Sequence, residues 1–591
     1  MDIFAVFRKK VLDCLVALQS DGVLPDDLDF TRVHVEPPRE SAHGDMSTNA
    51  AMVLAKPAGM KPQELAQLVI AGLEQDDAIK TCSIAGPGFI NFNLKNDVWL
   101  NQIRTVLEQG TAYGDSTMGH DAHGNREKVN VEYVSANPTG PMHVGHARGA
   151  VVGDALARLL ERAGFDVTRE YYINDAGSQV DTLARSVLLR AREAAGEEIG
   201  EIPEGLYPGD YLVPVGQAYL AHYGAEAFAQ GETQQLSQAK HIALPMIMDM
   251  IKADLEALGV QHDIFVSEQS LHDSGAVSGA LATLDAKGLI YEGVLEPPKG
   301  KTPPPDWEPQ PQTLFKSTEF GDDSDRALKK SDGSWTYFAP DIAYHSDKIK
   351  RGFHRMIDVW GADHAGYIKR MQSAIAAMSD NQANLDVKVC QMVKLMRGGE
   401  PVKMSKRAGS FVTLREVVDE VGKDVVRFMM LTRKNDAPLD FDFLTVKEKS
   451  RENPVFYVQY AYARIHSVCR NAVKDGVVDE EDLKPSALVR ANLSTLTHAQ
   501  ELSLVRQLAA LPRVLESAAL FHEPHRISIY LNDISSEFHA LWNMGKEQPG
   551  LKFIQQSKAA TLDRLALISA VALALESGLD ILGVKPEKEM R

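Results

Sequence analysis

Two histidines lie three residues apart at the end of residues 135–146, which read Ser-Ala-Asn-Pro-Thr-Gly-Pro-Met-His-Val-Gly-His. His143 and His146 share one face if a helix begins here. The first N–H groups of such a helix can bind phosphate, and the imidazoles could hydrogen-bond the charge that builds on an α-phosphate under attack. Pro138 rigidifies the turn, and Gly145 lets a nucleotide lie against the backbone. The alternatives are a helix cap with two surface histidines, or half of a metal site.

Two lysines follow in residues 402–409, which read Val-Lys-Met-Ser-Lys-Arg-Ala-Gly, in a glycine-rich loop that we place at about residues 396–410. Lys403 and Lys406 could close over a pyrophosphate leaving group and offset its negative charge. A short basic run on its own is usually a solvated face. Its combination with the histidine segment is what indicates a nucleotide site.

The elements around the histidines are those of a nucleotide-binding domain. Residues 128–134 are typical of a buried strand, and residues 147–163 are typical of a helix that Gly164 ends. A strand, a short loop and a helix in this order open an α/β domain with a parallel sheet. Further strands are predicted at residues 167–173, 336–338 and 356–360.

The 591 residues are too many for one core and predict three domains. An α+β domain is expected at residues 1–115, where residues 3–18 and 62–73 have helical periodicity and residues 90–94 alternate as in a strand. A Rossmann-like catalytic domain is expected at residues 116–454, with an insertion at about 196–320 that proline and glycine clusters indicate. An all-α bundle is expected at residues 455–591, with helices at 456–472, 491–521, 525–544 and 561–582.

Composition excludes several classes of protein. With 44% hydrophobic and 24% charged residues the chain is ordinary and globular, and its net charge of −18 argues against a protein that coats nucleic acid. A large enzyme can still confine its basic residues to one face. The four distant cysteines indicate no disulfide framework, we expect no protein-bound metal, and the longest apolar stretch, residues 565–575, falls short of the about 20 residues of a membrane span. We expect a cytoplasmic monomer with no membrane partner.

The two motifs together resemble the His-Ile-Gly-His and Lys-Met-Ser-Lys-Ser signatures of class I aminoacyl-tRNA synthetases. Val144 replaces Ile without a change of volume, and Arg407 stands where the final Ser would be, which leaves the role of that position open. Within the class, the sequence resembles the arginyl-tRNA synthetase family over essentially its whole length. The other segments that carry this likeness are Val-Glu-Tyr-Val-Ser-Ala-Asn-Pro-Thr-Gly-Pro at 131–141, Tyr-Ile-Asn-Asp-Ala-Gly at 172–177, Gly-Ala-Asp-His at 361–364, Gly-Asp-Met-Ser-Thr-Asn-Ala at 44–50, Gly-Pro-Gly-Phe-Ile-Asn-Phe at 86–92 and Leu-Gly-Val at 582–584.

The resemblance implies an arginine–tRNA ligase. Such an enzyme activates L-arginine with ATP, which carries Mg²⁺, transfers it to the 3′-terminal adenosine of tRNA(Arg) for protein synthesis, and requires the tRNA for activation. The catalytic residues would be His143, His146, Lys403 and Lys406. The ATP site would comprise Pro138, Gly140, His143, Gly145, His146, Gly361, Asp363, Lys403, Met404, Ser405 and Lys406.

Arginine places its own demands on a pocket, because a guanidinium is planar and always charged and selects carboxylates in bidentate geometry. The resemblance places Glu132 or Asn137 on the α-amino side. Tyr337 and Asp341 would lie near the guanidinium, on one face if the chain turns helical between them. The full expected set is Glu132, Asn137, His143, Tyr337, Asp341 and His364. Alternatively Asp341 caps a helix, Tyr337 packs in the core and His364 is a satisfied buried histidine.

Two further pairs are candidates for tRNA contacts. Phe89 and Asn91 resemble positions that read a base of the tRNA elbow loop, an aromatic ring beside an amide. Tyr530 and Trp542 are candidates for stacking on anticodon bases, in a helical domain that resembles an anticodon-binding domain. All four could instead simply pack in their domains.

Three rival functions stay open. A small-molecule nucleotidyltransferase of the same superfamily shares His-x-Gly-His but would not need a large helical domain after the lysine loop. A non-catalytic RNA-binding descendant should have lost one of the histidines or lysines, and none is missing. A synthetase for another amino acid is the nearest alternative, and exchange assays with all amino acids would identify it.

Overall fold

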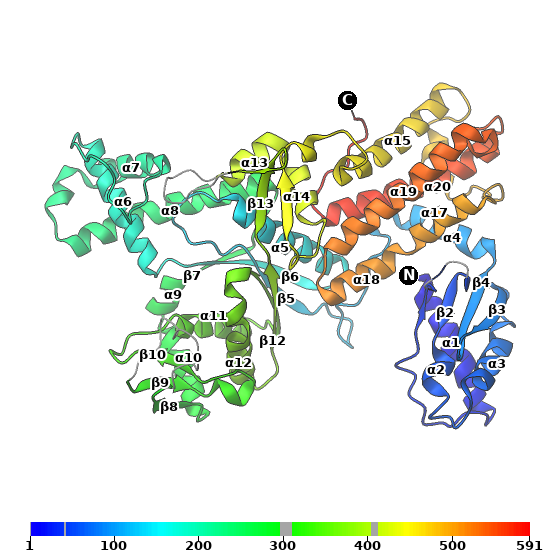
Figure 1. Cartoon of the computed structure of the whole chain (residues 1–591), viewed down its shortest axis with the longest axis horizontal. Coiled ribbons are helices and arrows are strands. Elements are labelled where there is room, and N and C mark those ends of the chain that lie inside the picture. The colour runs from blue at the N-terminus through cyan, green and yellow to red at the C-terminus, as the bar shows by residue number, and fades with distance from the viewer. Residues whose placement is uncertain (1, 39, 41–42, 296–309, 403–411, 591) are drawn as a thin grey trace.

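The fold is that of a computed structural model, which describes residues 2–38, 40, 43–295, 310–402 and 412–590. Figure 1 shows a small N-terminal domain in blue, a large central α/β region from cyan to yellow, and a bundle of orange and red helices. The bundle contacts the N-terminal domain through α4, Asn96–Gln109, which packs on α17, Ala499–Ala509, and on α20, Lys558–Ile581.

The N-terminal domain is a four-stranded antiparallel sheet with helices packed on it. The strands β1 (Val35–Glu36), β2 (Met46–Thr48), β3 (Ile79–Ala85) and β4 (Phe89–Leu94) follow the order β1-β2-β4-β3. The helices are α1 (Ile3–Ser20), α2 (Ala50–Leu54) and α3 (Pro62–Leu73). The bounds of α3 are those predicted, because apolar residues recur at helical spacing and a proline fits the first turn.

A five-stranded parallel sheet forms the centre of the molecule. Its strands are β5 (Lys128–Glu132), β6 (Asp166–Ile173), β7 (Ile264–Ser267), β11 (Arg355–Gly361) and β12 (Asn384–Cys390), in the order β12-β11-β5-β6-β7. Glu132 is level with Asp358 on one side and with Glu170 on the other. The carboxyl ends of the strands therefore meet at one edge, where α/β proteins bind ligands. The predicted fold class, α/β and α with a Rossmann-like parallel sheet, is confirmed.

Helices connect these strands. They include α5 (Val144–Arg162), α6 (Ser178–Ala194), α11 (Phe338–Lys350) and α12 (Ile368–Ser379). The strand predicted at residues 336–338 is wrong: Thr336 donates its N–H to the carbonyl of Leu328, and Phe338 begins α11. A short apolar run does not distinguish a strand from the first turn of a buried helix, and Pro340 is tolerated in that turn.

The region between β6 and α11 adds helices and a small sheet. It comprises α7 (Val213–Tyr223), α8 (Glu232–Leu258), α9 (Glu268–Asp273), α10 (Ala276–Ala286), and the strands β8 (Ile290–Gly293), β9 (Gln312–Phe315) and β10 (Arg326–Lys329). One strand of the central sheet, β7, also lies within the residues predicted as an insertion. In Figure 1, α6, α7 and α8 extend away from the sheet.

A fourth sheet and two short helices lead from the central sheet into the bundle. They are β13 (Val393–Arg397), β14 (Glu400–Pro401) and β15 (Leu439–Asp442), with α13 (Leu414–Val421) and α14 (Lys423–Met430). The bundle comprises α15 (Pro454–Lys474), α16 (Pro485–Leu488), α17, α18 (Leu511–Phe521), α19 (His525–Glu547) and α20.

The helix predicted at residues 491–521 is two helices, because Pro512 near the start of α18 cannot continue the hydrogen-bond ladder of α17. In the part of the chain that the structure describes, no helix combines the length and apolarity needed to cross a membrane.

Candidate active site

The turn after β5 is strained. Val134 and Ser135 have φ angles of 73° and 38°, a region that non-glycine residues rarely adopt and that is least favourable for a β-branched residue. The turn brings the hydroxyl of Ser135 to Glu132, whose Oε1 accepts its hydrogen bond at 2.9 Å. The same hydroxyl accepts the N–H of Tyr172 at 3.1 Å. Such strain persists where surrounding contacts enforce it, often at ligand sites.

The two histidines cap α5 in a reciprocal arrangement. His143 is the N-cap, its Nδ1 accepts the N–H of Gly145 at 3.1 Å, and His146 Nδ1 accepts the N–H of His143 at 3.3 Å. An Nδ1 that accepts is unprotonated, so each neutral ring carries its proton on Nε2. The rings stack at 3.9 Å. A Cβ at Gly145 would lie 2.7 Å from His143 Cε1, so glycine makes room for this ring.

The chain on the far side of the lysine segment is hydrogen-bonded to the two residues that flank His143. Val144 donates its N–H to the carbonyl of Val412 at 3.2 Å, and Leu414 donates to the carbonyl of Met142 at 2.8 Å. At the near side, Val402 donates to the carbonyl of Leu395 in β13 at 2.9 Å. The catalytic candidates Lys403 and Lys406, with Met404 and Ser405, lie outside the described residues.

The other ATP-site candidates surround the same sheet edge. Pro138 is buried, and a Cβ at Gly140 would lie 2.8 Å from the ring of Tyr211. Gly361 ends β11, and a Cβ there would lie 2.5 Å from Oδ1 of Asp363, which is exposed. The side chain of His364 is 66% exposed, which excludes its alternative as a buried histidine.

Asp341 and Tyr337 lie at the start of α11. The Oδ2 of Asp341 accepts the hydroxyl of Tyr367 at 2.7 Å, and Tyr337 is 71% exposed, which does not fit a core aromatic. Burial raises the pKa of Asp341 to about 7. The nearby carboxylates of Glu268 and Glu132 also raise it, whereas Tyr367 and His345 lower it. The carboxylates of Glu268 and Glu132 thus lie close enough to act on Asp341, and a group of carboxylates is a charge pattern suited to a guanidinium.

Glu268 is a site residue that the sequence did not reveal. It is the first residue of α9 and buried, and burial raises its pKa. Asp175, in the predicted Tyr-Ile-Asn-Asp-Ala-Gly segment, holds this helix start through Ser267 Oγ at 2.7 Å and the N–H of Gln269 at 2.8 Å. The available signal was a serine N-cap followed by an acidic residue at 267–268.

The two candidates for the α-amino side of arginine, Asn137 and Glu132, differ in exposure. Asn137 is exposed, and its Nδ2 donates to Gln179 Oε1 in α6 at 2.9 Å. Glu132 is buried at the end of β5, and the Nζ of Lys348 donates to its Oε2 at 2.6 Å. Burial raises the pKa of Glu132, and Lys348 acts against this.

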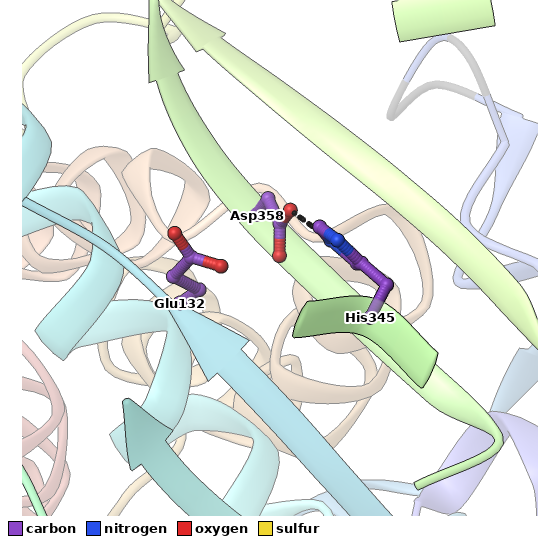
Figure 2. Close-up of side chains that lie close together, drawn as sticks. All are labelled: Glu132, His345 and Asp358. Atoms are coloured by element: carbon purple, nitrogen blue, oxygen red, sulfur yellow. Dashed lines mark hydrogen bonds and ion pairs between the residues drawn. The ribbon is translucent and has the colours of Figure 1, made fainter. Parts of the chain in front are cut away.

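Glu132 belongs to a buried cluster of charged groups beneath the sheet edge. Figure 2 shows Glu132 from β5, Asp358 from β11 and His345 from α11 facing one another. Their ligand atoms lie within 4.8 Å of one another, which is compatible with a metal ion. However, Lys348 Nζ also lies 3.2 Å from Asp358 Oδ1, so an ammonium already bridges both carboxylates. A cation of the protein itself therefore compensates this cluster.

The tRNA candidates differ in exposure. Phe89 is 40% exposed and can present its ring, whereas Asn91 is 5% exposed. Tyr530 is 2% exposed, which favours its packing alternative. Trp542 is half-buried, and the guanidinium of Arg464 lies 4.6 Å from its ring centroid.

Arg464 connects Trp542 to a second ring on the bundle. Its guanidinium lies 4.1 Å from the ring centroid of Tyr460, which is partly exposed and stacks on Phe456 at 5.5 Å. Rings next to a guanidinium form the kind of surface on which nucleic-acid bases stack.

The chain is similar to known proteins over its whole length. Three family models match: "Arginyl tRNA synthetase N terminal domain" at residues 6–94, "tRNA synthetases class I (R), catalytic domain" at 103–207 and "DALR anticodon binding domain" at 458–590. Relatives named arginine–tRNA ligase from Parvibaculum lavamentivorans and Ruegeria pomeroyi are 60% and 57% identical, each over 100% of both chains. The arginyl-tRNA synthetase structure from Thermus thermophilus shares the fold, with a TM-score of 0.74 over 100% of both chains at 20% identity. The predicted resemblance is confirmed, and the chain belongs to the arginyl-tRNA synthetase family of class I aminoacyl-tRNA synthetases.

Proposed function

We propose that this chain is an arginine–tRNA ligase of the cytoplasm that acts in protein synthesis. In the first step the carboxylate of L-arginine attacks the α-phosphate of ATP, which enters with Mg²⁺, and pyrophosphate leaves. In the second step a ribose hydroxyl of the terminal adenosine of tRNA(Arg) attacks the carbonyl carbon of the arginyl-adenylate, and AMP leaves. The in-line displacement at phosphorus needs positioning and charge stabilisation more than a protein base.

The residue roles follow from these demands. His143 and His146 stabilise the charge on the α-phosphate during attack, next to the first N–H groups of α5. Lys403 and Lys406 neutralise the leaving pyrophosphate. Gly361 and Asp363 at the end of β11 contact the nucleotide, in keeping with ligand binding at the carboxyl ends of parallel strands.

One observation carries this proposal: the backbone at residues 412–414 is hydrogen-bonded to the backbone at 142–144. Lys403 and Lys406 precede Val412 by nine and six residues, so this anchor beside the histidine pair is close to both lysines in the sequence. A chain of that length at about 3.3–3.6 Å per residue can bring its lysines to a triphosphate that starts at α5.

Arginine selection is supported by the acidic space around Asp341, Glu132 and Glu268. The guanidinium pairs with Asp341 and Tyr337, and the α-ammonium lies toward Glu132 and Asn137, with His143 and His364 at the borders of the pocket. A neutral or acidic amino acid would offer the carboxylate of Asp341 no cationic partner, which disfavours its binding.

Two assays test the function. Aminoacylation of bulk tRNA with labelled arginine should incorporate arginine, and ATP–pyrophosphate exchange with each of the twenty amino acids should respond to arginine alone and only when tRNA is present. Exchange with another amino acid would identify a different synthetase. Exchange without any response to tRNA would favour the small-molecule nucleotidyltransferase.

The lysine role has its own test. Replacing Lys406 with Ala should lower kcat of exchange by about a hundredfold or more, because a transition-state charge contact is lost, while arginine binding changes little. Lys394→Ala is the matched control, since this exposed lysine lies on β13 before the loop. A Lys406→Ala enzyme that exchanges at the wild-type rate would remove this role.

A further inference from the structure

Lys348 is a fully buried lysine that has kept its charge. It projects from α11, and its Nζ donates to Glu132 Oε2 at 2.6 Å and to Asp358 Oδ1 at 3.2 Å. Burial disfavours the ammonium, but Asp358 and Glu132 outweigh this and hold the pKa of Lys348 above its usual value. A buried charge is stable only with such partners, so this position requires a cation.

The contacts of Lys348 continue across α11. Asp358 accepts from His345 Nε2 at 3.0 Å, and His345 Nδ1 lies 2.9 Å from the carbonyl oxygen of Asp341. The ring of His345 therefore links Asp358 in β11 to the backbone of the first turn of α11. The pKa of Asp358 lies below its usual value although burial acts to raise it, because Lys348 and His345 both favour the ionised carboxylate.

The cluster thus contacts one carboxylate of the proposed arginine pocket, Glu132, and the backbone of a second pocket residue, Asp341. Glu132 comes from the sheet and is held by Ser135 on one oxygen and by Lys348 on the other. Asp341 comes from the helix, and its backbone carbonyl is linked to Asp358 through the ring of His345. Without the ammonium, Glu132 and Asp358 would be two buried carboxylates on neighbouring strands, and such a pair lowers its energy by taking up a proton.

We propose that Lys348 is a positioning residue for the amino-acid substrate, which keeps Glu132 ionised and in place and fixes α11 against β5 and β11. This inference rests on the proposed function, because it assigns Glu132 to the α-ammonium of arginine. Lys348 itself does not touch the substrate. Its loss weakens arginine binding through Glu132 and leaves the nucleotide side of the site intact.

The test is Lys348→Met, which keeps the length of the side chain and removes the charge. ATP–pyrophosphate exchange with tRNA present should show an arginine KM raised about ten- to a hundredfold, as expected when a charge-assisted contact is lost, with the KM for ATP within about twofold of wild type. An unchanged arginine KM in a folded variant overturns the proposal. A wild-type enzyme without arginine-dependent exchange would instead overturn the proposed function.

Arg351→Met is the matched control. Arg351 is a second cation of α11, and it ties the helix to β6 through two 2.8 Å bonds to Glu170 without contact to Glu132. A purely structural role of Lys348 predicts that both variants lose the same fraction of activity and leave the arginine KM alone. Our proposal predicts a raised arginine KM for Lys348→Met only.

A second variant covers the case in which Lys348→Met does not fold, which circular dichroism would show. Asp358→Asn keeps the ammonium next to Glu132 but removes its other anchor. The arginine KM should then rise about three- to tenfold, less than for the loss of the lysine itself. A folded Asp358→Asn enzyme with wild-type KM for arginine would also overturn the proposal.

Discussion

Asp341 is a half-buried carboxylate at the start of α11, and a guanidinium needs that carboxylate in its ionised form. Burial raises the pKa of Asp341 to about 7. Glu268 and Glu132 also raise it, and the hydrogen bond from the hydroxyl of Tyr367 lowers it. In the empty site the group is therefore mostly protonated below that pH. The guanidinium keeps its own charge throughout, so the proton must leave Asp341 when arginine binds.

Arginine affinity should consequently fall as pH falls through about 7 and level off above it. Calorimetric titration should give a Kd at pH 6 about tenfold higher than at pH 8, because the ionised fraction changes by that factor around a pKa near 7. Tyr367→Phe removes a hydrogen bond that favours the ionised form and should shift the profile to higher pH. A flat profile in wild type would contradict the assignment of Asp341 to the guanidinium.

Asp341→Asn isolates the same carboxylate. The amide cannot ionise, so the Kd for arginine should rise by roughly ten- to a hundredfold and lose most of its dependence on pH between 6 and 8. The temperature of thermal unfolding is the control for the fold. It should change little, because the substitution of Asp341 by Asn removes no ion pair. Unchanged affinity would place the guanidinium elsewhere.

The first turn of α5 shows at the scale of an element how backbone and chemistry are combined. Gly145→Ala adds a Cβ 2.7 Å from the His143 ring and 2.8 Å from its Nδ1, so the ring must move from its cap position. Exchange kcat should fall about a hundredfold, as for the loss of one transition-state hydrogen bond. The helix itself should not suffer, because alanine is the better helix former.

Gly149→Ala is the matched control on the same helix, one turn on. A Cβ there meets nothing within 4 Å. This variant should keep wild-type exchange activity and gain up to about 1 kcal/mol in the free energy of unfolding. Equal activity of the two variants would show that the position of the His143 ring does not matter for catalysis.

Elements with a strong local signal could be predicted, and those fixed by distant partners could not. The helix at residues 62–73 and the strand at 167–173 are determined by the pattern of their own side chains. The bounds predicted for both agree with the structure to within one residue. The helix start at Phe338 depends on packing that a three-residue apolar run does not reveal. Glu268 becomes a neighbour of Asp341 only through the order β6-β7 in the sheet, which sequence spacing does not contain.

At the scale of the whole molecule, polar contacts add to the packing of α4 on the helical bundle and fix the sheet of the N-terminal domain to it. Asp45, in the predicted Gly-Asp-Met-Ser-Thr-Asn-Ala segment, accepts from Leu94 N–H at 2.9 Å and from Trp99 Nε1 at 3.2 Å, and its other oxygen accepts from Arg506 Nε in α17 at 2.7 Å. Phe89 and Asn91 are on β4, which ends at Leu94. The contact of Arg506 with Asp45 therefore orients β4, with the tRNA candidates Phe89 and Asn91, relative to the helical bundle, which carries the candidate Trp542.

Arg506→Met should leave arginine binding unchanged and raise the Kd for tRNA about three- to tenfold, because a tRNA that contacts both domains benefits from their fixed geometry and loses part of that preorganisation. Filter binding with tRNA and calorimetry with arginine separate the two effects. Arg513→Met is the control: its pair with Glu36 spans the same two domains at 3.2 Å, but Glu36 is 61% exposed whereas Asp45 is 8% exposed, and pairs with an exposed carboxylate contribute little. Equal tRNA affinity of wild type and Arg506→Met would mean that the bundle and the N-terminal domain bind tRNA independently, or that only one of them does.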